Sequence, residues 1–272
     1  MTGPEPAEDS DDASHDADDA PYDGQVLFDL LDSTKAVLFD FDGPVCDLFG
    51  GASTASVAAE VKEAARQAWG VLDPEVEACD DSHGILRRLR DVYDRPAARS
   101  LGRDPLDQAE LIVARQELGA VEKAAETPHV GTLLGLLHEL GIRMVIVSNN
   151  AERPIREYLR RHGLEERFGH VFGRDPDNAG LMKPDPDCVR RALKYLDVPA
   201  GSCLFVGDQP SDLEAARSAD TCLPFLGYTR DRAKASDMAA NRANAVVDSY
   251  LPVIGAAEKV RKARWASRHQ VG

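Results

Sequence analysis

Apolar positions along this chain alternate between short unbroken runs and stripes with helical spacing. The runs at residues 36–39, 143–147, 203–206 and 245–247 are typical of strands buried on both faces of a parallel sheet. The clearest helical stripes between the runs are Leu133, Leu136, Leu137 and Leu140; Ile155, Tyr158, Leu159 and His162; and Val189, Ala192, Leu193 and Leu196. This alternation predicts an α/β fold with a doubly wound (Rossmann-like) parallel sheet core and helical crossovers.

About a hundred residues separate the first run from the second, far more than an ordinary connecting loop contains. They carry three further helical stripes, formed by Val57, Val61, Ala64 and Ala68; by Ile85, Leu89 and Val92; and by Leu111, Leu118, Val121 and Ala125. We therefore expect an inserted α-helical cap over residues 49–127, with the core formed by residues 25–48 and 128–257.

Gly50-Gly51 and Thr127-Pro128 are the candidate hinges of this cap. A cap that closes excludes water and contacts the rest of the substrate, so it sets specificity. Charged residues on the expected cap helices are candidate substrate contacts, although such residues usually face solvent; they are Lys62, Arg66, His83, Arg87 and Arg88. The substrate itself cannot be read from them.

Two aspartates, Asp40 and Asp42, end the first apolar run. Because strand side chains alternate with period two, both project to the same side where the strand ends. Neighbouring carboxylates in a partly desolvated place repel each other unless a cation lies between them or one carries a proton. On this segment alone, an acidic turn after a strand is an equally good interpretation.

Three further segments place polar side chains after apolar runs or in a loop before a helix. Ser148 and Asn149 follow the second run, Lys183 precedes Pro184 in a loop, and the run at 203–206 leads to Asp208 and Asp212. Ligands of open α/β sheets bind beyond the carboxyl ends of the strands. The four segments together therefore predict one site that combines carboxylates, a hydroxyl and an ammonium.

In this order, the segments resemble the motifs of the haloacid dehalogenase-like hydrolase superfamily, whose members are mostly phosphatases. The family pattern is Asp-x-Asp, then Ser or Thr, a lone Lys, and Gly-Asp-x-x-x-Asp. It is matched by Asp40-Phe41-Asp42, Ser148, Lys183 and Gly207-Asp208-Gln209-Pro210-Ser211-Asp212, within a resemblance that covers residues 36–247. One departure is Pro44, where the family usually has Thr or Val; proline lacks the N–H that such a residue could donate.

The resemblance implies a phosphatase mechanism and a Mg²⁺ cofactor. Asp40 would be the nucleophile that forms an aspartyl-phosphate, and Asp42 the general acid and base. Mg²⁺ would be held by Asp40, the backbone carbonyl of Asp42 and Asp208, with Asp212 either as a further ligand or in support of the ligands, an all-oxygen set that suits this ion. Lys183 would neutralise charge, and Ser148 would contact the phosphoryl oxygens. Asn149 would either contact the phosphate or support the residues that do.

Each of these residues also has a plain structural interpretation. Lysines lie mostly on the surface, and Ser148 or Asn149 could simply favour a turn. Asp212 could be a first-turn residue of a helix, because Ser211-x-x-Glu214 resembles a capping box. Asp185 and Pro186 likewise predict the start of a helix, as its N-cap and its first residue.

The charge of the chain is concentrated in its ends. Residues 1–24 hold nine acidic side chains and no Lys or Arg, which accounts for nine of the fifteen net negative charges. Such a composition predicts a disordered acidic tail. Residues 258–272 form a basic C-terminal segment that contains Lys259, Arg261, Lys262, Arg264, Trp265 and Arg268. With an acidic tail and no basic surface, nucleic acid is not an expected partner.

The cysteine content and the length of the apolar runs indicate the kind of protein and its location. Five cysteines without a Cys-x-x-Cys pair argue against a disulfide framework or a zinc site. The apolar runs have the length of strands, so we expect no membrane span or signal peptide. We expect a cytoplasmic monomer or homodimer that acts on a small phosphorylated metabolite.

Other reactions of the superfamily remain alternatives. A dehalogenase needs no acid for its leaving group and generally lacks the second aspartate, so Asp42 argues against it. A phosphonatase needs a cap lysine, for which Lys62 is the obvious candidate. A sugar-phosphate mutase uses the same four motifs. A catalytically silent, protein-binding member is the alternative outside enzymology, and Pro44 keeps it open.

Overall fold

A computed structural model describes residues 24–98 and 100–269 of the chain. Its centre is a six-stranded sheet in which all neighbouring strands are parallel. The strand order is β5 (His170–Phe172), β4 (Arg143–Val147), β1 (Ala36–Phe39), β6 (Cys203–Gly207), β7 (Phe225–Tyr228) and β8 (Ala245–Val247). The expected Rossmann-like α/β core is thereby confirmed. The acidic segment lies outside the described residues except for Gly24, which begins the first helix.

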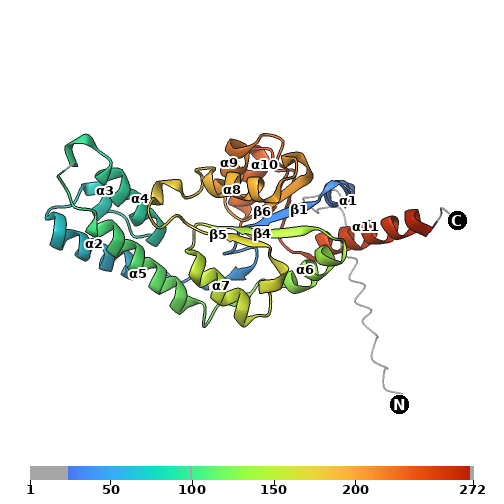
Figure 1. The fold of residues 1–272 in the computed structure, drawn as a ribbon, viewed down its shortest axis with the longest axis horizontal. Helices are drawn as coiled ribbons and strands as arrows, with labels where there is room; N and C mark the ends of the chain where they lie inside the picture. Colours follow the sequence, from blue (N-terminus) through green and yellow to red (C-terminus); the bar gives the residue numbers. More distant parts are fainter. Residues whose placement is uncertain (1–23, 99, 270–272) are drawn as a thin grey trace, which may run out of the picture.

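Helices cover both faces of the sheet (Figure 1). One face is covered by α1 (Gly24–Ser33), α6 (Val130–Glu139), α7 (Glu152–Arg161) and α11 (Leu251–His269). The other is covered by α8 (Asp187–Leu196), α9 (Pro210–Ala219) and α10 (Arg232–Ala240). Strand β1 packs against both helix layers. Val37 and Phe39 belong to the apolar cluster on the α1, α6, α7 and α11 side, and Ala36 and Leu38 to the cluster on the α8, α9 and α10 side.

The register of the central strands positions the site. Phe39 at the end of β1 lies opposite Ile146 of β4 and Val206 of β6, so the chain leaves all three strands at the same edge. From β1 the sheet grows outward through β4 and β5, and it continues on the opposite side of β1 with β6. This reversal is the topological switch point at which α/β sheets bind their ligands.

The segment between β1 and β4 forms a helical unit that we call the cap. It contains α2 (Ala55–Trp69), α3 (Pro74–Glu77), α4 (Ser82–Tyr93) and α5 (Asp104–Ala120), and it has an apolar cluster of its own. The two chain segments that join it to the core pair as antiparallel strands β2 (Cys46–Asp47) and β3 (Ala125–Glu126). The cap lies at one end of the molecule and the end of α11 at the other (Figure 1).

The predicted apolar stripe of α5 is wrong at Leu111 and Ala125, although Val121 is buried as expected. Leu111 is 70% exposed, and Ala125 lies in β3, beyond the end of the helix. The helix buries a different set of side chains, namely Pro105, Ala109, Ile112, Val113 and Glu117. A hydrophobicity pattern could not identify this face, because a glutamate is one of its buried members.

Two predicted helix starts differ by one or two residues from the observed ones. Pro186 is the N-cap of α8 and Asp187 its first residue, while Asp185 accepts a hydrogen bond from the Asp187 N–H at 2.9 Å. At α9 the capping box is formed by Gln209 and Asp212, not by the predicted Ser211 and Glu214, because Pro210 occupies the first turn and shifts the cap back along the chain.

The basic C-terminal residues belong to a longer helix than expected, since the boundary at residue 258 lies inside α11. This helix packs against α1 and α6, and its cations bind neighbouring groups, as Arg261 does with Glu139 at 2.7 Å. All five cysteines are unpaired thiols. In the described part of the chain, none of the helices combines the length and apolar composition needed to cross a bilayer.

Candidate active site

A cavity of about 650 Å³ opens at the sheet edge between the core and the cap. The structure brings all the predicted site residues together along its wall, which includes Asp40, Asp42, Ser148, Asn149, Lys183, Asp208 and Asp212. The cap and its first junction contribute Asp47, Phe49, Asp81, His83 and Arg87. The ends of β1, β4 and β6 and the loop before α8 therefore meet at one place.

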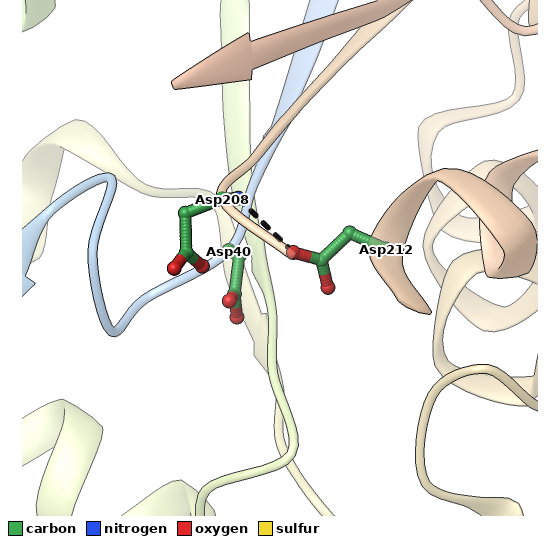
Figure 2. Close-up of side chains that lie close together, drawn as sticks. All are labelled: Asp40, Asp208 and Asp212. Carbon is green, nitrogen blue, oxygen red and sulfur yellow. Dashed lines mark hydrogen bonds between the residues drawn. The ribbon is translucent and has the colours of Figure 1, made fainter. Parts of the chain in front are cut away.

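Three of the aspartates form a compact acidic group (Figure 2). One carboxylate oxygen each of Asp40, Asp208 and Asp212 lies within 4.8 Å of the other two. The Oδ1 atom of Asp208 is buried and, within the described residues, has no hydrogen-bond partner. A buried acceptor without a donor is costly in a folded protein. An oxygen-binding cation in this group would remove that cost.

The electrostatics of the group also favour a cation. Burial raises the pKa of Asp40 to about 6, although the Lys183 ammonium acts in the opposite direction. Burial, followed by repulsion from Asp40 and Asp212, raises the pKa of Asp208 to about 8. These residues thus fit Mg²⁺, which prefers carboxylate oxygens and stabilises their ionised forms.

Lys183 lies between two members of the acidic group and is only 2% exposed. Its Nζ atom is 2.8 Å from Asp40 Oδ1 and 2.7 Å from Asp212 Oδ1, and it donates to the Val147 carbonyl at 3.2 Å. Burial alone lowers the pKa of this ammonium, but the charges of Asp212 and Asp40 outweigh burial and raise it. Lys183 is therefore a buried cation of the site and not a surface lysine.

The loop that carries Lys183 is fixed by the side chain of Asn149. The Asn149 Oδ1 atom accepts a hydrogen bond from the Lys183 N–H at 2.7 Å, and its Nδ2 donates to the Lys183 carbonyl at 3.1 Å. The neighbouring Ser148 hydroxyl donates to Asn150 Oδ1 at 3.1 Å. The Asn149 amide thus holds the backbone of the lysine.

Asp42 stands apart from the acidic group. Its Oδ1 atom accepts a hydrogen bond from the Leu48 N–H at 2.8 Å, and burial raises its pKa. Next to it, Gly43 has a φ of +101°, and a Cβ there would lie 2.7 Å from Asp208 Cγ, so this position requires glycine. The Pro44 carbonyl accepts a hydrogen bond from the Tyr250 hydroxyl at 2.8 Å, which fixes the turn despite the missing N–H.

Sequence reasoning missed a buried polar network that joins the cap to the core. Glu117 of α5 is 0% exposed. Its Oε1 atom is 2.8 Å from Arg174 Nη1, 3.2 Å from Asn150 Nδ2 and 2.9 Å from His83 Nε2. Its Oε2 atom accepts from the Ala151 N–H at 2.9 Å. No local pattern marks such a glutamate, because its partners are distant in sequence.

The network keeps Glu117 ionised. Burial alone would raise its pKa, but the Arg174 guanidinium and His83 together outweigh burial and lower the pKa to about 2. The same carboxylate therefore serves as an acceptor for donors from the loop after β4, from the loop after β5 and from α4. This arrangement ties α4 and α5 to the sheet edge.

Only two of the five charged cap residues considered from the sequence line the cavity, His83 and Arg87. The Lys62 ammonium instead binds the Glu77 carbonyl at 3.0 Å and Asp80 at 3.1 Å. Arg66 and Arg88 pair with Glu77 and Glu75 on the cap surface. The phosphonatase alternative, which needs Lys62 in the cavity, therefore has no support from the fold.

Comparison with known proteins agrees with this geometry. The family model of the haloacid dehalogenase-like hydrolases matches residues 34–220. A phosphoglycolate phosphatase from Rhodospirillum rubrum is 30% identical over 215 residues, which cover 76% of this chain and 85% of that protein. An N-acetylmuramic acid 6-phosphate phosphatase from Pseudomonas aeruginosa is 30% identical over 206 residues, covering 71% and 82%.

Solved structures share the fold. A haloacid dehalogenase-like hydrolase from Streptococcus pneumoniae aligns with a TM-score of 0.52 at 18% identity, over 82% of this chain and 98% of that one. CbbY from Rhodobacter sphaeroides, in complex with phosphate, aligns with a TM-score of 0.51 at 21% identity, over 80% and 95%. The chain belongs to the haloacid dehalogenase-like hydrolase family.

The Glu117 network makes a prediction about stability. Replacing Glu117 with Gln leaves the side chain of Arg174 buried beside an uncharged partner, although Glu110 still pairs with it at 2.8 Å. We expect the free energy of unfolding, measured by urea denaturation, to fall by about 3 kcal/mol. The matched Glu122→Gln change affects an exposed pair with Arg161 and should change stability little. Equal effects of the two substitutions would contradict the role assigned to Glu117.

The acidic group predicts how stability depends on pH and metal. In the folded state, the pKa of Asp40 is raised from 3.8 to about 6 and that of Asp208 from 3.8 to about 8. Between pH 3.8 and about 8, the metal-free folded state therefore binds more protons than the unfolded state. Unfolding free energy in EDTA should therefore fall as the pH rises from 5 to 8. Thermal melting should show this fall and its reversal by Mg²⁺ at pH 8. In Asp208→Asn, the slope of stability against pH should be shallower. An equal slope in that variant would refute the assignment.

Proposed function

We propose that this chain is a Mg²⁺-dependent phosphatase that hydrolyses a small-molecule phosphate monoester through an aspartyl-phosphate intermediate. The observation that carries this proposal is the placement of Asp40. Its buried carboxylate lines the cavity, contacts the Lys183 ammonium, and belongs to the acidic group that fits a metal ion. A nucleophile needs this combination to approach a phosphoryl group that is itself anionic.

In the first step, an oxygen of Asp40 attacks phosphorus and the bond from phosphorus to the ester oxygen breaks. Asp42 gives its proton to the departing alcohol oxygen, a role supported by the raised pKa that burial produces. In the second step, Asp42 removes a proton from water, whose oxygen attacks phosphorus. The bond between phosphorus and the Asp40 oxygen breaks, inorganic phosphate leaves, and the Asp40 carboxylate and the Asp42 acid are restored.

The other site residues bind the metal ion or the phosphoryl group, or they neutralise negative charge. Mg²⁺ would be held by Asp40 and Asp208, with Asp212 beside them and, as the family resemblance implies, the Asp42 carbonyl; when bound, it offsets the charge on the phosphoryl oxygens. Lys183 keeps Asp40 ionised and adds a second positive charge. Ser148 is placed to donate to a phosphoryl oxygen. Asn149 acts through the Lys183 backbone, and a direct phosphate contact from it stays a prediction.

We further infer that the substrate is a small phosphorylated carboxylic acid. The curated relatives named above are phosphatases of phosphoglycolate and of N-acetylmuramic acid 6-phosphate, and both compounds carry a carboxylate as well as a phosphate ester. A cavity of about 650 Å³ accommodates a metabolite of this size.

The alternatives to hydrolysis have weaker support. The presence of Asp42 in the cavity argues against a dehalogenase. A silent scaffold has no need for a buried lysine between two carboxylates, and the turn at Pro44 is held by Tyr250. A sugar-phosphate mutase would use the same residues, so the activity assay must distinguish phosphate release from isomerisation.

Substitution of the nucleophile tests the proposal. Wild-type protein with Mg²⁺ should release phosphate from p-nitrophenyl phosphate and from small phosphorylated acids, and EDTA should stop the release. Asp40→Asn should lower kcat by a factor on the order of 1,000 or more, because the amide cannot form the aspartyl-phosphate. The control Asp237→Asn, at an exposed position of α10, should retain activity.

Phosphate release that survives in Asp40→Asn would refute the nucleophile. A folded wild-type protein that releases no phosphate but isomerises a phosphorylated sugar would replace the phosphatase with the mutase.

A further inference from the structure

The cations that line the cavity differ in whether they have a carboxylate partner. Lys183 contacts Asp40 and Asp212, and Lys234 lies 3.9 Å from Asp208. Arg87 of α4 also lines the cavity, but it forms no ion pair with any residue in the described part of the chain. Of these three cations, Arg87 is therefore the one without a carboxylate partner, and its charge is available to an anionic ligand.

The hydrogen bonds of Arg87 leave part of its guanidinium available. Its Nη2 atom donates to the Met182 carbonyl at 2.8 Å and to the Lys183 carbonyl. Within the described residues, the N–H groups of Nε and Nη1 have no acceptor. Burial lowers the pKa of Arg87, and this effect exceeds the opposite effect of four carboxylates, of which Asp81 contributes most. Such a partly desolvated guanidinium gains from an anionic partner.

His83 lies four residues before Arg87 and therefore on the same face of α4. Its Nε2 atom is 2.9 Å from Glu117 Oε1, and an ionised carboxylate only accepts, so Nε2 carries a hydrogen. Nδ1 is the ring nitrogen left for another contact, and in the described structure it has no hydrogen-bond partner. Glu117 thus fixes which nitrogen of His83 is available.

We propose that Arg87 and His83 together bind the carboxylate of the substrate while its phosphoryl group lies at Asp40. The proposal rests on the proposed function and assigns to that site the residues that recognise the second anionic group. Arg87 supplies the charge, and Nδ1 of His83 adds a donor when the ring carries a hydrogen on both nitrogens. Glu117 acts as a positioning residue, because it touches His83 and not the substrate.

The remaining cap side of the cavity explains why a carboxylate would bind here and not elsewhere. Asp47 and Asp81 also line the wall and repel an anion. The N–H groups of Arg87 Nε and Nη1, together with its positive charge, supply the donors and the charge that a carboxylate needs. An ester without the carboxylate would leave those donors unpaired, which is how such sites reject close analogues.

Two esters with the same two-carbon skeleton provide the test. Phosphate release from 2-phosphoglycolate and from ethyl phosphate is measured with the full chain and Mg²⁺. We expect wild-type kcat/KM to be at least about tenfold higher for 2-phosphoglycolate, and Arg87→Gln to reduce this preference by about tenfold to a hundredfold, mainly through KM. His83→Gln should reduce it by a smaller factor.

Arg88→Gln is the matched control, because Arg88 lies on the same helix but pairs with Glu75 at 3.4 Å on the surface. It should keep the wild-type preference. If Arg87→Gln does not fold, as judged by thermal melting, Arg87→Lys replaces it and should show an intermediate preference, since it keeps the charge but loses the Nε and Nη1 donors.

Several outcomes would overturn the assignment. An equal loss on both esters in Arg87→Gln would mean that Arg87 only holds the Lys183 loop. A wild-type enzyme that hydrolyses ethyl phosphate and p-nitrophenyl phosphate without preferring 2-phosphoglycolate would remove the carboxylate site and leave the proposed phosphatase intact. If the protein hydrolyses none of the three esters, both the carboxylate site and the proposed phosphatase activity are refuted.

Discussion

The ion pairs of Lys183 with Asp40 and Asp212 are the constraint on which the site depends. Three aspartates beyond the ends of β1 and β6 concentrate negative charge in a buried place, which the raised pKa values of Asp40 and Asp208 record. The lysine offsets part of this cost, but the buried Asp208 Oδ1 atom still has no hydrogen-bond partner among the described residues. The acidic group therefore fits a divalent ion in addition to the lysine.

Much of the core and the site could be predicted because their signals are local. Buried parallel strands appear as unbroken apolar runs, and the residues that follow them must meet at one sheet edge. Asp40, Ser148 and Asp208 thus needed no knowledge of long-range contacts. Lys183 was harder, because loops do not fix direction, and its loop position before a helix supported it less directly than the strand ends supported the other residues.

The features that sequence reasoning missed all depend on partners far along the chain. The burial of Glu117 depends on Arg174, 57 residues later, so the face of α5 could not be read from its own apolar pattern. Asn149 is one of the predicted site residues, but the partner of its amide, a backbone 34 residues away, is not visible in the sequence. Side chains of this kind look like ordinary surface residues until the fold places their partners beside them.

The same buried network restricts how the cap can move. Gly50, Gly51 and the residues around Thr127 were expected to act as hinges, but the two junctions pair with each other as β2 and β3, and Glu117 binds the core beside them. A motion that separated Glu117 from Arg174 would expose two ions without their partners and would cost several kcal/mol. Motions that keep this contact as a pivot avoid that cost. Helix α4 shares this contact, because His83 binds Glu117, and its Arg87 also donates to the Met182 carbonyl, so a ligand held by Arg87 would lie between the cap and the loop that carries the catalytic lysine.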